Sequence, residues 1–152
     1  MKIFIQCLLF LLLAFLPVLI ATSCENEDDI EEIFWNKNWK ITGATINGTS
    51  INSEALKELY ASAQSYYLIF SAGTMKGFLS PNCPITGAWS ANGKNHDFHC
   101  DLNVAENINE SALNLQLYEI LNNAKKYNGD GNVLRIEVDS RNFIRLTVKN
   151  NI

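Results

Sequence analysis

The stretch HDFHCD, residues 96–101, places two histidines, two aspartates and a cysteine within six positions, and all three residue types bind metals. A zinc site needs four converging ligands, or three with a water molecule. On a β-strand, successive side chains alternate between two faces, so His96 and His99 would point in opposite directions. We therefore expect a strand with Asp97, His99 and Asp101 on its outer face and no metal. A metal site is the alternative interpretation.

The same stretch contains a cysteine that has one natural partner in an oxidising compartment. Cys83 and Cys100 flank the dipeptide Asn92-Gly93, which is the strongest short signal for a β-hairpin. With that dipeptide as the turn, Ile85 would lie opposite Cys100, and both cysteines would be diagonal neighbours on the inner face. We therefore expect a disulfide between Cys83 and Cys100, which would stabilise the domain by roughly 3 kcal/mol.

Two further features could bind a ligand. The sequence NGDGN, residues 128–132, imitates the start of a calcium loop, but Val133 stands where an EF-hand needs glycine, so we predict a turn. The aromatic residues Trp39, Tyr67 and Trp89 could line a ligand pocket, although aromatic side chains on strands more often fill a core. We find no nucleophile with a base and no pair of acids, so we expect neither catalysis nor a cofactor.

The elements that must position these residues follow from apolar periodicity. We expect strands over residues 40–46, 66–70 and 74–79, a hairpin over 83–102, a final hairpin over 134–148, and helices over 53–64 and 109–125. This order predicts an α+β fold, mainly an antiparallel sheet of about seven or eight strands with two packed helices.

The beginning of the chain indicates export. A positive start at Lys2 is followed by an apolar run and then by small residues before Cys24, which is the layout of a secretory signal over residues 1–23. The segment Ala21-Thr22-Ser23-Cys24 resembles the lipobox of bacterial lipoproteins. That resemblance implies cleavage before Cys24, lipidation of Cys24 and anchoring in a membrane. The alternative is an ordinary secretory signal followed by an incidental cysteine.

Residues 24–33 carry six of the 16 acidic residues, and the remaining acids and bases nearly balance. Because like charges repel, we expect this segment to be an extended tether, with a single domain over residues 34–152. The near-neutral domain gives no basic face for nucleic acid. The acidic run also resembles the export signal of surface lipoproteins of Bacteroidetes, which implies an outer-membrane lipoprotein, periplasmic or surface-exposed. A linker without any address is the alternative.

A pattern in the central hairpins supports a family resemblance. In the run IFSAGTMKGFLSPNCPITGAW the pattern is carried by Phe70, Gly73, Gly77, Asn82, Cys83, Gly87 and Trp89. Together with Trp39 before it and Cys100 after it, this run resembles the META domain of HslJ-like secreted proteins, over roughly residues 39–148. The resemblance implies a META-like fold, no catalytic residues and an association with envelope stress.

The sequence therefore predicts a lipid-anchored protein of the cell envelope with a non-catalytic binding role or a role in envelope stress. Its membrane contact would be the lipid on Cys24, and a protein or small-molecule partner is not identified by any motif. Two alternatives fit the same features. One is a lipocalin-like carrier that holds a small apolar ligand among the aromatic residues, and the other is an inhibitor of a secreted enzyme.

Overall fold

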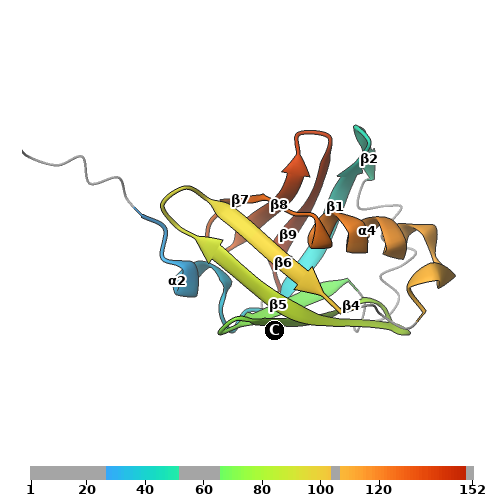
Figure 1. Cartoon of the computed structure of the whole chain (residues 1–152), viewed down its shortest axis with the longest axis horizontal. Coiled ribbons are helices and arrows are strands. Elements are labelled where there is room, and N and C mark those ends of the chain that lie inside the picture. The colour runs from blue at the N-terminus through green and yellow to red at the C-terminus, as the bar shows by residue number, and fades with distance from the viewer. Residues whose placement is uncertain (1–26, 52–65, 104–106, 150–152) are drawn as a thin grey trace, which may run out of the picture.

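The computed structural model describes residues 27–51, 66–103 and 107–149. Figure 1 shows a strongly curved sheet with a long helix at one end and a short helix at the other. The described strands are β1 (Trp39–Ile46), β2 (Thr49–Ile51), β3 (Tyr67–Ser71), β4 (Thr74–Ser80), β5 (Cys83–Asn92), β6 (Asp97–Leu102), β7 (Lys126–Gly129), β8 (Val133–Asp139) and β9 (Asn142–Val148). The described helices are α2 (Ile30–Phe34), the short 3₁₀ helix η2 (Ile108–Glu110) and α4 (Ala112–Asn122). The signal segment, Cys24 and the helix expected over 53–64 lie outside the described residues.

The sheet closes on itself as a barrel. All described strand pairs are antiparallel, and each strand from β3 to β9 pairs with the next along the chain. The strand β1 pairs with β3 on one side and with β9 on the other, where Trp39 lies opposite Val148. The strand β2 extends β1 beyond β3 as a short hairpin. The predicted α+β class, with a mainly antiparallel sheet and packed helices, is confirmed.

Alternation along the strands explains which side chains face the interior. In β6 the pattern is regular, with Phe98, Cys100 and Leu102 buried and the residues between them exposed. The ring of Phe34, which comes from α2, lies among four other aromatic rings, with centroid distances of 4.8 Å to Trp89, 5.2 Å to Phe70 and to Tyr127, and 5.8 Å to Phe98. These side chains fill the end of the barrel next to α2.

The helix α2 corrects the predicted tether boundary. Residues up to 33 were expected to be extended and solvated, yet Asp29 caps the helix by accepting a hydrogen bond from the backbone N–H of Glu32, and Ile33 is buried. The apolar residues Ile30, Ile33 and Phe34 recur at helical spacing and pack on the barrel. The free energy that they gain by burial exceeds the repulsion between the flanking acidic side chains. The domain therefore begins by Asp28.

The central hairpin has a different register from the predicted one. Trp89 pairs with Cys100 instead of His96, because residues 93–96 form a four-residue turn where a two-residue turn was expected. A shift by four residues is even, so every side chain keeps its predicted face. The distance between the cysteines does change. Cys83 is six residues along β5 from the partner of Cys100, which is about 20 Å of strand.

That separation excludes the predicted disulfide, because a disulfide needs Cα atoms within about 7 Å of one another. Both Cys83 and Cys100 carry thiols in the structure, and both are buried. The prediction of a Cys83–Cys100 bridge is therefore wrong for this fold.

The helix α4 covers the part of the barrel where two neighbouring strands share the fewest residue pairs. The strands β6 and β7 share one residue pair, Asp97 with Lys126. Beyond that pair, α4 packs against both β6 and β8 and buries Leu117, Ile120 and Leu121. The helix ends at Asn122, three residues before the predicted end, and Lys126 begins the strand β7, which was not predicted. Among the described residues, no helix has the length and apolar character needed to cross a membrane.

Candidate functional site

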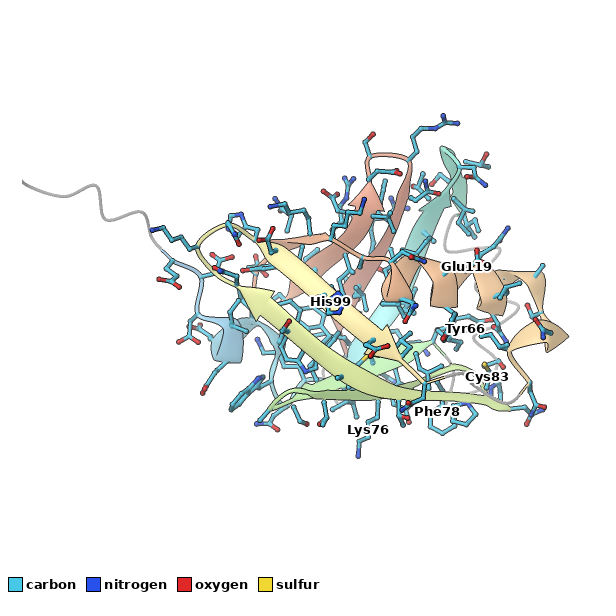
Figure 2. All side chains as sticks on the ribbon, viewed as in Figure 1. Tyr66, Lys76, Phe78, Cys83, His99 and Glu119 are labelled. Carbon is cyan, nitrogen blue, oxygen red and sulfur yellow. The ribbon has the colours of Figure 1, made fainter. Side chains whose placement is uncertain are left out.

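The stretch HDFHCD is divided between a turn and a strand. His96 closes the β5–β6 turn with a positive φ of 58°. His99 lies on the outer face of β6, as Figure 2 shows, and Cys100 points into the barrel. Within the described part of the chain, no group of three or more His, Cys, Asp or Glu side chains is placed to hold a metal. The potential metal ligands of residues 96–101 are therefore close together in sequence but do not converge on one point in the structure.

Cys100 is placed as a core residue. Burial, and then the neighbouring negative charge of Asp101, raises the pKa of the Cys100 thiol to about 12. The thiolate is the reactive form of cysteine, so a thiol that keeps its proton is a poor nucleophile and a poor metal ligand. The position of Cys100 on the inner face thus favours packing over chemistry.

The three aromatic residues predicted as ligand-lining do not meet in one pocket. Trp39 and Trp89 are buried in the core, and their indole N–H groups donate to the backbone oxygens of Phe34 and Ser71 at 3.4 Å and 2.8 Å. Tyr67 lies on the opposite face of the sheet, with its ring 5.5 Å from that of Phe78. The predicted pocket is therefore split between the core and the outer surface.

A polar cluster that sequence reasoning missed lies where the N-terminal segment meets the barrel. The carboxylate of Asp28 accepts a hydrogen bond from the Tyr127 hydroxyl at 2.8 Å and lies 3.2 Å from Nε2 of His96. The backbone N–H of Asp28 donates to the carbonyl of Gly93 at 3.2 Å. Burial, together with the bond to Asp28, raises the pKa of Tyr127. No sequence signal separates Asp28 from its acidic neighbours, so the cluster could be found only in the folded chain.

A concave feature lined by described residues lies at the mouth of the barrel, beside α4. This cleft, called the mouth cleft below, has a volume of about 410 Å³. Its described lining residues come from α4 and the segment after it, from β8, and from the turns at the ends of β1 and β8: Ile46, Asn47, Gln116, Glu119, Ile120, Asn123, Lys125, Val138 and Asn142.

The lining combines a small apolar floor with a polar rim. Ile46, Ile120 and Val138 supply the apolar side chains, and the rim carries amide groups together with Glu119 and Lys125. Figure 2 shows Glu119 on α4, at the end of the molecule away from α2. Small-molecule sites are usually lined mainly by apolar side chains with a few polar groups, so this cleft is more polar than most, but the mouths of barrels are among the common positions of such sites. The amides could accept and donate hydrogen bonds to one ligand, while the two charged groups could bind groups of opposite sign.

The rim could not have been recognised from sequence, because its residues come from distant parts of the chain. The turn holding Asn47 meets the turn holding Asn142, whose side-chain oxygen accepts from the Asn47 N–H at 2.9 Å. Asn123 uses its own amide to donate to the carbonyl of Glu119 at 2.8 Å, at the end of α4. The only signal in the sequence is an excess of amide side chains near predicted turns, which is also typical of ordinary turns.

Two smaller grooves lie on the outer face of β3, β4 and β5. They have volumes of about 380 Å³ and 290 Å³ and share Lys76 and Thr86, which are exposed. Figure 2 shows Lys76 and Phe78 on the side of the sheet away from the core. The groove beside Phe78 is lined by Tyr67 and Pro84 as well, so it is the more apolar of the two.

Comparisons with known proteins identify a family. The model of the family described as "Domain of unknown function (DUF4847)" matches residues 25–147. A crystal structure of a DUF4847 family protein from Bacteroides vulgatus is similar in fold, with a TM-score of 0.61 and 21% sequence identity, and the alignment covers 81% of this chain and 99% of that one. No curated protein matches the sequence. The resemblance to the META domain is tested by neither match and stays a prediction.

Proposed function

We propose that this chain, which belongs to the DUF4847 family, is a lipid-anchored envelope protein that binds a ligand or partner without catalysis, at the mouth cleft. The observation that carries the proposal is the contrast between the two ends of the barrel. The end next to α2 is filled by closely packed aromatic rings, whereas the end next to α4 has a cleft with an apolar floor and a polar rim.

The filled interior disfavours the carrier alternative. A lipocalin-like protein needs an internal cavity for its apolar ligand. Here Phe34, Trp89 and Phe98 lie within van der Waals packing distances at the centre of the barrel end that such a ligand would occupy. A ligand at the rim can form hydrogen bonds without displacing these rings. The alternative of an inhibitor of a secreted enzyme is also consistent with a lipid anchor. An inhibitor would bind a protein at the cleft, whereas a ligand-binding protein would bind a small molecule there.

Lipidation of Cys24 and an outer-membrane location belong to the same proposal. Lipidation is supported by the resemblance of residues 21–24 to a lipobox, and labelling with an alkyne fatty acid measures it directly. The outer-membrane location is supported by the resemblance of the acidic run to the export signal of surface lipoproteins, and membrane fractionation measures it. We expect the label on the native protein and none on a Cys24→Ala variant. The envelope-stress role follows from the META resemblance, and the growth of a deletion strain under envelope stress measures it.

Binding at the mouth cleft is tested by site-specific photocrosslinking in intact cells. A photoreactive amino acid replaces Gln116, which lines the mouth cleft, and in the matched control it replaces Lys76, which lines both outer grooves. We expect an adduct from position 116 that the control does not give, and its mass distinguishes a small ligand from a protein. Identical adducts at both positions, or none at position 116, would contradict the proposal.

A further inference from the structure

The N-terminal segment is fastened to one end of the barrel at Asp28. Its backbone N–H bonds to Gly93 in the β5–β6 turn, and its carboxylate bonds to the buried Tyr127. Gly93 is itself buried, and an ideal Cβ on it would overlap the carbonyl oxygen of Asp28. Two backbone segments therefore meet at a contact that only glycine permits, and this contact fixes where the chain leaves the domain.

A second set of contacts holds the following helix in place. The Nζ of Lys37 donates to the carbonyl of Glu32 in α2 and, at 2.9 Å, to that of Gly131 in the loop between β7 and β8. Phe34 is 0% exposed. The chain therefore cannot lengthen its link to a membrane by releasing α2 without opening the aromatic core.

The number of residues between the proposed lipid and this contact sets a short limit. Three residues, 25–27, separate Cys24 from Asp28. Even a fully extended chain covers at most about 14 Å over those four steps. By contrast, the ten residues of β5 span about 33 Å, so the link is shorter than half the length of the barrel wall.

Asp28 and the α4 side of the mouth cleft lie apart along the molecule. Figure 1 shows α2 and the β5–β6 turn at one end of the longest axis and α4 toward the other. The near edge of the cleft is formed by Lys125, which is two residues from Tyr127 and so lies closer to Asp28. The end with Asp28 must stay within the reach of the link, so α4 is the part of the cleft that can extend away from the lipid surface.

We infer that the end of the barrel formed by α2 and the β5–β6 turn is held against the lipid headgroups, and that α4, with the side of the mouth cleft that it forms, is presented away from the membrane. The inference rests on the proposed lipid anchor at Cys24. Its partner is the lipid surface itself. The short link, and not electrostatic attraction, holds this end at the membrane. The helix α2 exposes Glu31 and Glu32, and anionic headgroups repel both side chains.

Short-range fluorescence quenching in vesicles tests the inference on the full lipidated protein. A fluorophore is attached to Lys94→Cys, in the β5–β6 turn, or to Gln116→Cys, at the mouth cleft, and the vesicles contain phosphatidylethanolamine, phosphatidylglycerol and a lipid with a spin-labelled headgroup. The native thiols of Cys83 and Cys100 are 0% and 1% exposed, so labelling is confined to the introduced cysteine. We expect quenching at position 94 to be several-fold stronger than at position 116.

A matched variant separates the short link from other causes. A long glycine-serine segment inserted after Glu25 leaves every described contact intact, and it should reduce quenching at position 94 to the level at position 116. Equal quenching at both positions without the insertion, or strong quenching at position 94 that survives it, would overturn the inference. The intact mass of each sample reports acylation of Cys24. Equal quenching in acylated protein refutes the orientation alone, whereas unacylated protein refutes the anchor on which it rests.

Discussion

Truncation of Phe34 to alanine should strongly destabilise the protein. The Phe34 side chain is 0% exposed and lies in contact with four aromatic rings, two of them edge-on. Replacing a fully buried phenylalanine by alanine costs about 3–5 kcal/mol, because apolar contact is lost and a cavity remains. Surrounding rings held by strands on several sides can collapse little into that cavity, so we expect a value in the upper half of the range. A domain of this size is stable by only about 5–15 kcal/mol.

The matched control is Phe143→Ala, which makes the same truncation on the outer face of β9. Phe143 is 9% exposed and lies 3.6 Å from the guanidinium carbon of Arg135 and 5.4 Å from that of Arg145. Its loss should cost about 2 kcal/mol, because the side chain is largely buried but packs on the charged side chains of two arginines.

Urea unfolding of the mature chain, followed by circular dichroism, measures both variants. We expect Phe34→Ala to lower the free energy of unfolding by at least twice as much as Phe143→Ala. If Phe34→Ala does not fold, Phe34→Leu provides a milder change that should fall between them. A Phe34→Ala variant no less stable than Phe143→Ala would refute the reasoning, because residues 28–33 would then belong to the detachable tether that the sequence first indicated.

Three further outcomes are expected. Thiol titration of the unreduced mature domain should find Cys83 and Cys100 both unreactive in native buffer and both reactive in denaturant; a domain without reactive thiols in denaturant would restore the disulfide. Because the folded state keeps the Cys100 proton and the unfolded chain loses it, the stability that this thiol contributes is complete below its ordinary pKa of 9.0 and is lost as the pH rises toward about 12. Urea midpoints across that window should therefore fall more steeply for the native protein than for Cys100→Ala, and parallel slopes would exclude the effect. Gly93→Ala should cost about 1–3 kcal/mol in urea unfolding by displacing Asp28 from its hydrogen bonds, whereas Gly43→Ala, whose added Cβ would meet only the end of the long Arg145 side chain, should cost less.

Side-chain alternation predicted the faces of the strands well, but it could not give the register. Phe98 and Cys100 are inside and His99 is outside, as their positions in β6 indicated. The turn between β5 and β6 was predicted at Asn92-Gly93 because that dipeptide usually forms a two-residue turn. Here Gly93 is needed instead for its close approach to Asp28, and side-chain oxygens of Asn92 and Asn95 accept from the N–H groups two residues later. A long-range contact thus replaced a local preference.

The other differences have the same origin. The acidic side chains before Phe34 predicted a solvated segment, because charge dominates the local pattern, yet the apolar residues between them find a surface on the barrel only after it has closed. The mouth cleft was missed because Asn47 and Asn142 are brought together by the pairing of β1 with β9. Local sequence therefore determines the strands and which face each side chain occupies. The mouth cleft and the attachment of the N-terminal segment instead depend on closure of the barrel.

The pairing of β1 with β9 also determines when the protein could fold during the export that we propose. Trp39, near the start of the domain, has its cross-strand partner Val148 almost at the end of the chain. A chain that crosses a membrane from its N-terminus therefore presents β1 with one edge open until the last strand has emerged. Contacts this far apart in sequence make folding slow, and an open strand edge invites pairing with other chains. In the proposed export, the chain is thus most exposed to misassembly between translocation of β1 and translocation of β9. Chaperones that suppress misassembly would act in the same interval.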